Sequence, residues 1–356
     1  MSVSVFNHPY LAGLLGNDSV SRYFDAEMDI QAMLSFEAAL AEAQGVTGAI
    51  PIAAVAPIKT ACLELVPDMD RLKSGTANDG VVVPELVRQL KISVSDEHKA
   101  YVHFGATSQD VIDTSLMLRL RSCIEIIEET LERVVVQIEQ LNEKFGDRQL
   151  LGRTRMQQAL PITVSHRLAN WRTPLTKQLE KLKSVKVALL NVQFGGPVGT
   201  LDNFQEAGPK IRSKMSELLG LGDPGGCWHT DRTSIVDFAN WLSVLTGVLG
   251  KIGKDITLMS INEVKEISLR GGGGSSAMPH KQNPIKAEML VTLGQFNAMN
   301  MSGMHQVLSH ENERSGQSWT LEWMLLPQMV MTTSTSLRLA EELLIKIERI
   351  GDDNLN

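Results

Sequence analysis

Residues 271–284 read GGGGSSAMPHKQNP and place hydroxyl, cationic and amide side chains on a glycine-rich segment. Four consecutive glycines free the backbone from the restraint of a Cβ atom, so the segment can move and reach unusual conformations. Gly/Ser runs are usually flexible linkers, but a linker is not normally followed at once by Met-Pro, a basic pair and Asn-Pro. No strand pattern precedes the glycines and no G-K-[ST] closes them, so a nucleotide-binding loop is not indicated. The segment predicts a closing catalytic loop.

A second polar segment, residues 103–114, reads HFGATSQDVIDT. Thr107 or Ser108 can cap a following helix, and Asp110 would then lie in its first turn, where negative charge complements the helix dipole. Capping alone would account for these residues. A helix amino terminus with two hydroxyl groups also binds anions readily, so both roles stay open.

Two further polar segments carry arginines. Residues 152–159, GRTRMQQA, hold Arg153 and Arg155, and residues 310–319, HENERSGQSW, hold Arg314 between two helical patterns. An isolated Arg pair most commonly lies in a solvated basic loop. The whole chain carries 34 Lys and Arg against 41 Asp and Glu, a net charge of −7, which does not favour nucleic acid or an anionic membrane as a partner. An anionic small-molecule substrate would therefore need a local cluster of such cations.

Long helical patterns must position these segments. From Ile112 to Phe145 apolar residues recur every three or four positions, which predicts one continuous helix about 50 Å long. From Ile235 to Met259 spacings of three and four alternate strictly, as in a heptad seam. Similar patterns cover residues 162–193, 285–308 and 319–350, and strand signals are sparse. The sequence predicts an all-α fold, an elongated bundle of long helices.

The chain divides into two predicted domains. Residues 1–97 hold shorter helical candidates broken by prolines, including a helix capped by Ser21 and terminated at Gly45, and are expected to form an amino-terminal helical domain. Residues 98–350 are expected to form the central long-helix domain. Its pattern at 285–308 is apolar nearly all round, so other protein must cover that helix. We therefore expect a homo-oligomer.

The three cysteines, Cys62, Cys123 and Cys227, stand far apart without a C-x-x-C pattern. A disulfide framework and a zinc site are not indicated, and a reducing cytoplasm is the expected location. The first residues lack the features of a signal peptide, and no uninterrupted apolar run reaches about 18 residues. No membrane span is expected.

The segment GSSAMPHKQNP resembles the signature loop of the fumarase/aspartase superfamily. GATSQDVIDT and GRTRMQQA resemble the two other conserved segments of that superfamily, in the same order. Within it, VHFGATSQDVIDT, FEAALAEAQG, FGGPVGTL at 194–201 and the Trp-x-x-Glu-Trp pattern at 319–323 are most similar to the 3-carboxy-cis,cis-muconate cycloisomerases, a family of lactonising enzymes of aromatic catabolism. Adenylosuccinate lyases share a similar GSSAMPHK loop.

The resemblance implies a homotetramer around a central helical bundle, with each active site built from segments of three subunits and without a cofactor or metal. It implies that Ser275 is the general base, although Ser276 stays open. The catalytic candidates are therefore Ser275, Ser276, Lys281 and, as a secondary proton relay, His103. The candidates for binding a di- or tricarboxylate are Thr107, Ser108, Gln109, Arg155, Gln158, His280, Asn283 and Arg314.

Three features depart from the superfamily pattern. Gln282 stands where an arginine is usual, and the usual carboxy-terminal domain is expected to be largely absent because the chain stops at residue 356. Arg155 stands where fumarases and adenylosuccinate lyases often have a histidine. A departing water or amine must be protonated, which suits a histidine, but an arginine stays charged and cannot supply that proton.

The arginine bears directly on the reaction. In lactone formation a substrate carboxylate attacks the substrate's own double bond. This carboxylate is already an anion, so no base is needed to activate it. The predicted activity is therefore reversible lactonisation of 3-carboxy-cis,cis-muconate or an anionic analogue such as 3-sulfomuconate. Adenylosuccinate lyase, or a related amine-releasing lyase, is the alternative. A non-catalytic helical scaffold would give no reason for a lysine and two serines beside four glycines.

Overall fold

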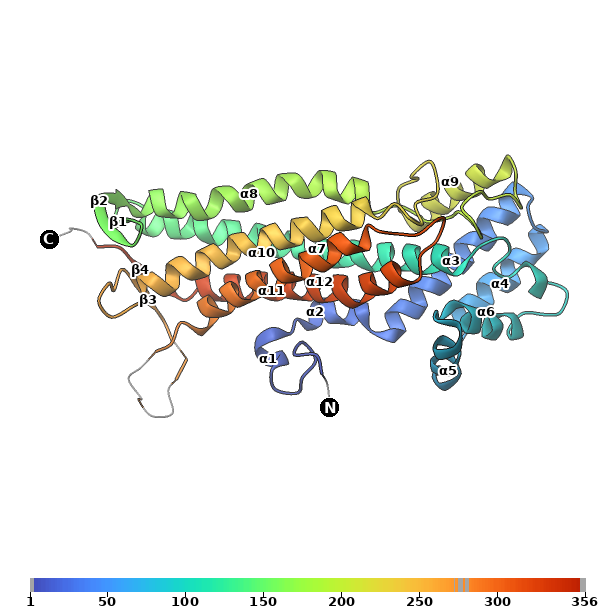
Figure 1. Ribbon diagram of the computed structural model, residues 1–356, viewed down its shortest axis with the longest axis horizontal. Helices are drawn as coiled ribbons and strands as arrows, with labels where there is room; N and C mark the ends of the chain where they lie inside the picture. Colours follow the sequence, from blue (N-terminus) through green and yellow to red (C-terminus); the bar gives the residue numbers. More distant parts are fainter. Residues whose placement is uncertain (1–2, 272, 275–277, 279–281, 353–356) are drawn as a thin grey trace.

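The computed structural model describes residues 3–271, 273, 274, 278 and 282–352 and shows an elongated bundle of long helices lying side by side (Figure 1). This confirms the predicted fold class. The bundle consists of α7 (Ser108–Phe145), α8 (Val164–Leu189), α10 (Thr233–Met259), α11 (Ile285–Val307) and α12 (Gln317–Leu344). Shorter elements cover its ends and sides: α1 (Ala12–Leu15), α2 (Asp18–Ser21), η1 (Arg22–Phe24), α3 (Ala26–Thr47), α4 (Ile52–Glu64), α5 (Met69–Asp79), α6 (Val83–Ile92), η2 (Lys99–Tyr101) and α9 (Ala207–Leu219).

The apolar stripe of α7 forms part of the bundle core. Every residue of the predicted stripe is buried except Ile112, which is half-buried. At about 1.5 Å per residue, the 38 residues of α7 span about 57 Å. Its length therefore sets the distance between the two ends of the bundle.

The heptad seam of α10 is buried along its whole length, from Ile235 to Met259. Glycine allows α10 and α11 to approach closely, because a Cβ atom at Gly253 would lie 2.4 Å from the carbonyl oxygen of Ala287. By length and composition α10 could cross a membrane, but 61% of its most apolar stretch is buried inside the protein. We therefore interpret α10 as a core helix. It is the one helix in the described part of the chain that is long and apolar enough to cross a membrane.

Three predicted helix boundaries were wrong. The amino-terminal helix α3 begins at Ala26, after Asp25, and ends at Thr47; Gly48, whose φ of 78° is left-handed, is its carboxy-terminal cap. Gly45 lies inside α3, where a Cβ would meet the side chain of Val55 at 2.2 Å, so this glycine serves close packing. At the other terminus α12 ends at Leu344, and the strand β4 (Ile347–Ile350) pairs antiparallel with β3 (Ile267–Leu269).

The sequence analysis also missed a β-hairpin. Residues of the GRTRMQQA segment form the ends of β1 (Gln149–Thr154) and β2 (Gln157–Thr163), which pair antiparallel. Helix α8 therefore begins at Val164, and the Thr163 hydroxyl caps it by accepting a hydrogen bond from the His166 N–H at 3.1 Å. Short strands joined by a tight turn carry too few residues for a period-two pattern to stand out.

The described residues form two hydrophobic cores. One lies inside the long-helix bundle, and the other joins α3, α4 and α6 to α9 and to the loop residues Val192 and Phe194. The second core thus combines helices near the amino terminus with a later segment of the chain, residues 192–215. The predicted division at residues 97 and 98 stays a prediction.

Candidate active site

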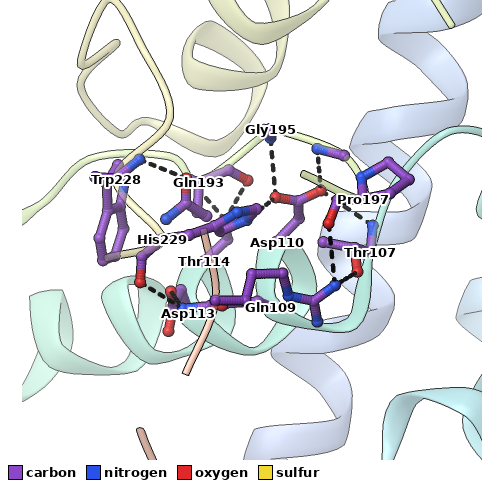
Figure 2. A network of polar contacts seen from close by, with 12 residues as sticks. Thr107, Gln109, Asp110, Asp113, Thr114, Gln193, Gly195, Pro197, Trp228 and His229 are labelled. Atoms are coloured by element: carbon purple, nitrogen blue, oxygen red, sulfur yellow. Dashed lines mark hydrogen bonds and ion pairs between the residues drawn. The ribbon is translucent and has the colours of Figure 1, made fainter. Parts of the chain in front are cut away.

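The amino end of α7 is organised around the buried carboxylate of Asp110 (Figure 2). Its Oδ1 accepts hydrogen bonds from the Gly195 N–H at 2.9 Å and from His229 Nε2 at 2.7 Å. Its Oδ2 accepts from the N–H groups of Thr107 and Gly196, both at 3.0 Å. Thr107 is therefore the cap of α7 and Asp110 lies in its first turn, both as predicted, and the Asp110 carboxylate also fastens two distant loops to the helix.

Arg314 lies over this helix end. Its exposed guanidinium donates from Nη1 to the Thr107 hydroxyl at 2.5 Å and to the Pro197 carbonyl at 3.4 Å. Arg314, Gln109 and Trp319 line a cleft of about 670 Å³. The half-buried Ser108 is the first residue of α7. A cation, a hydroxyl and a helix amino terminus meet here, and this combination suits a carboxylate.

Gln109 is fully buried although it lines the cleft. Its amide donates to the His229 carbonyl at 2.8 Å and to Asp113 Oδ2 at 3.2 Å. Its Oε1 has no hydrogen-bond partner among the described residues. The side chain therefore holds the helix to the 229 segment and retains one free acceptor.

Beneath the cleft, the buried Arg232 lies between two buried carboxylates. It donates to both oxygens of Asp113, at 2.7 and 3.0 Å, and to both oxygens of Glu322, at 2.7 and 2.9 Å. Burial alone would lower the pKa of Arg232, but the two carboxylates raise it above its ordinary value. Trp319 Nε1 adds a hydrogen bond to Asp113 at 3.0 Å. This fixed ion triad joins α7, α12 and the start of α10.

His229 is almost fully buried beside Asp110. Burial alone would lower its pKa, but the hydrogen bond to Asp110 and the neighbouring Cys227 raise the pKa to about 9. The raised value means that the protonated imidazolium is favoured in the folded protein. The proton on Nε2 points to Asp110 Oδ1.

The His229–Asp110 pair predicts a pH dependence of stability. Because the folded-state pKa is above the ordinary value of about 6.5, this contribution is fully present below pH 6.5 and is lost as the pH rises towards 9. We expect a loss of up to about 3 kcal/mol in the free energy of unfolding over this range. Denaturant titrations between pH 6 and 9.5 measure it. A His229→Gln variant should show a flatter profile, and an equally steep profile in that variant would contradict the assignment.

His103 interacts with a different carboxylate. Its Nδ1 lies 2.6 Å from Oε1 of the buried Glu37, and its φ of 60° is left-handed. Burial lowers the pKa of His103, but Glu37 more than compensates and raises it. His103 is not among the residues that line the Arg314 cleft. Its role as a proton relay stays a prediction.

The predicted cation Arg155 lies at the opposite end of the bundle. It occupies the turn of the β1–β2 hairpin with a left-handed φ of 48°, and its side chain is exposed. Arg155 lines a cleft of about 710 Å³ together with Arg153 and Lys251. Arg153 pairs with Glu266 at 2.5 Å, which neutralises it. The predicted binding residue Gln158 faces Arg153 across the hairpin and is exposed.

The glycine loop starts and ends near this hairpin end (Figure 1). Asn283 and Gly273 exchange two backbone hydrogen bonds, of 2.9 and 3.0 Å, which close the base of the loop. Asn283 also lines a cleft of about 740 Å³ with Gln282. Pro284 directly precedes α11, as expected. The predicted residues Ser275, Ser276, His280 and Lys281 lie outside the described residues.

The predicted site is therefore divided within one chain. Thr107, Ser108, Gln109 and Arg314 lie at one end of α7, and Arg155, Gln158 and Asn283 lie at the other (Figure 1). The length of α7 separates the two groups. A single site that uses both groups requires segments from more than one copy of the chain.

A sequence model for a lyase family matches residues 14–299. This chain belongs to the fumarase/aspartase lyase family. It is 37% identical to 3-carboxy-cis,cis-muconate cycloisomerase of Pseudomonas aeruginosa over 90% of this chain and 71% of that protein. It is 33% identical to the enzyme of the same name from Acinetobacter baylyi, over 97% of this chain and 78% of that protein.

A solved structure supports the same placement in the lyase family. The 3-carboxy-cis,cis-muconate lactonizing enzyme from Pseudomonas putida superimposes with a TM-score of 0.91 at 34% identity, covering 96% of this chain and 77% of the other. The predicted superfamily resemblance is therefore confirmed, and the chain has the fold of an enzyme family. In the described part of this lyase-family chain, no group of three metal-binding side chains lies together.

Sequence reasoning missed the buried partners of this lyase-family site. Asp113, His229, Arg232 and Glu322 come from three segments, and none was given a role, although Asp113 and Glu322 lie inside the quoted motifs. The local signal was weak, because a His or Arg in WHTDRTS reads as an exposed loop residue. Only the approach of distant segments turns these side chains into a buried network.

Proposed function

We propose that this chain is a cycloisomerase that converts 3-carboxy-cis,cis-muconate, or a closely similar anionic muconate, reversibly into its lactone. The similar proteins named for this activity support the proposal. The single observation that carries it is Arg155, an exposed permanent cation at the tip of the β1–β2 hairpin. An arginine there can bind substrate carboxylate but cannot protonate a leaving amine.

The reaction needs few groups from the protein. A carboxylate oxygen of the substrate adds to the double bond, a C–O bond forms, and negative charge develops on the carboxylate next to the α carbon. Arg155, Lys281 and the Arg314–Thr107 end of α7 would stabilise that charge by fixed positive potential. In the lactonising direction the Ser275 hydroxyl would give one proton to the α carbon, and in the reverse reaction the deprotonated Ser275, stabilised by the neighbouring cation, would remove it.

We further propose that the site forms in a homotetramer, from segments of three subunits. The separation of Thr107 from Arg155 along α7 supports this, since one chain alone cannot bring them together. Met299 on α11 is 76% exposed in the single chain, as expected for a helix that another subunit covers. We also propose a cytoplasmic location, to which the three free cysteines are suited.

The activity is tested by following the loss of muconate absorbance with 3-carboxymuconate as substrate. The same sample is then offered 3-sulfomuconate and adenylosuccinate. Turnover of a muconate and none of adenylosuccinate is expected. Turnover of adenylosuccinate alone would overturn the cycloisomerase assignment and favour the amine-releasing lyase.

Arg155→Met should raise the KM for the muconate about ten- to a hundredfold, because a hydrogen bond to a charged group contributes about 1.5–3 kcal/mol. The KM of Arg155→Lys should lie between those of the wild type and Arg155→Met, because lysine keeps the charge but not the forked geometry of the guanidinium. Steady-state kinetics measure both. An unchanged KM in Arg155→Met would remove this residue from the site.

A further inference from the structure

Cys227 lies two residues before His229, in the segment that crosses the amino end of α7. It is half-buried, whereas Cys62 and Cys123 are both buried. Burial raises the pKa of each of these two thiols to about 12, so they are inert as nucleophiles near neutral pH. No step of the proposed lactonisation uses Cys227.

The thiol lies against the same backbone that holds Asp110. The Gly195 N–H and His229 Nε2 share one carboxylate oxygen, at 2.9 and 2.7 Å. A Cβ atom added at Gly195 would lie 2.5 Å from Cys227 Sγ, and one added at Gly199 would lie 3.2 Å from it. Glycines at these two positions therefore leave the space that the sulfur occupies.

Only one ring nitrogen of His229 is hydrogen-bonded to Asp110, so the other can interact with this thiol. Its Nε2 is committed to Asp110, and its side chain is only 2% exposed. Its Nδ1 is buried and has no hydrogen-bond partner among the described residues, while Cys227 is the neighbouring titratable side chain after Asp110. An imidazole held by a carboxylate on one nitrogen can carry the proton of a neighbouring thiol on its other nitrogen, which leaves the sulfur as the nucleophilic thiolate.

The segment is held in place on both sides of the imidazole. The Trp228 N–H donates to Gln193 Oε1 at 3.1 Å (Figure 2). Its indole Nε1 donates to the Val192 carbonyl at 3.0 Å. The Gln109 amide binds the His229 carbonyl. Cys227 and His229 are thus fixed relative to Asp110.

We propose that Cys227 is a reactive thiol and a modification site for small soluble disulfides, with His229 and Asp110 as its activating pair. In this pair the thiol proton lies on His229 Nδ1 before the disulfide arrives, so the ring is an imidazolium that the Asp110 carboxylate stabilises and Cys227 is the thiolate. Cys227 Sγ then attacks one sulfur of the disulfide. A new S–S bond forms, the old S–S bond breaks, and the released thiolate takes a proton from water.

The adduct must strain the helix end. Sγ already fills the space beside Gly195 and Gly199, so a bulky adduct displaces the backbone that donates to Asp110. Because Asp110 also holds the Thr107 N–H, the disturbance reaches the residue that contacts Arg314. Modification therefore lowers the melting temperature and is reversed by a reducing agent.

The test is the reaction of the native full chain with 5,5′-dithiobis(2-nitrobenzoate), followed by the release of the coloured thiolate. At pH 6.5 we expect one fast equivalent, at least about tenfold faster than free glutathione, because only about one in a hundred ordinary thiols is ionised there. Cys227→Ser should abolish the fast phase without changing basal activity. Cys62→Ser is the matched control and should retain it.

His229→Gln should remove the rate advantage, because an amide cannot take the thiol proton. If that variant fails to fold, the rate of the wild-type reaction with the disulfide is measured between pH 5.5 and 8.5. A rate that stays high at low pH supports the activating pair. A wild-type rate at pH 6.5 no greater than that of glutathione would overturn the proposal. A fast phase that survives in Cys227→Ser would do the same.

Discussion

Ser275→Ala is expected to lower turnover of the muconate about a hundred- to ten-thousandfold, the range that one positioned proton-transfer group contributes. The substrate carboxylates are bound by other residues in the proposal, namely Arg155, Lys281 and the Arg314–Thr107 pair. The KM should therefore change little, which is the pattern of a group that acts mainly in the transition state. Steady-state kinetics on the purified variant measure both constants.

Ser276→Ala is the matched control for this prediction, since it removes the same atom one residue later. It should retain turnover within about threefold if Ser275 handles the proton, since a neighbouring group that takes no part in proton transfer loses little of the transition-state energy. The reverse result would assign the proton to Ser276. Turnover equal to wild type in both variants would exclude a serine from the mechanism.

Arg232→Met is expected to lower the free energy of unfolding by about 3–5 kcal/mol, because it leaves buried charge without its partner. Arg232 is fully buried and makes four hydrogen bonds, two to Asp113 and two to Glu322. Removing the guanidinium would leave two carboxylates facing each other in a site from which water is excluded. Urea denaturation at pH 7 measures the loss.

The matched control is Arg133→Met, which breaks a surface pair. The Arg133 and Glu341 side chains are 52% and 23% exposed, so we expect the free energy of unfolding to change by less than about 1 kcal/mol. Adding Glu322→Gln to Arg232→Met should recover part of the stability, because one buried charge disappears. A loss in Arg232→Met no larger than in the control would show that the triad does not act as described.

The sequence by itself determined the long helices and the family. Three-and-four spacing is a local property, so the stripes of α7 and α10 were predictable, and both are buried in the bundle core. Thr107 and Asp110 were recognisable as a helix start for the same reason, since capping involves neighbours within one turn. The four polar segments were also found, because each is contiguous in the sequence.

Only the tertiary structure decided which polar groups meet. Arg232 pairs with Asp113, 119 residues away, and with Glu322, 90 residues away, and no local pattern encodes such a pairing. The hairpin that carries Arg155 is equally non-local, since its register depends on the pairing of two short strands. Burial converts these side chains from solvated loop residues into a fixed charge network, because a charge removed from water must find its partner within the protein.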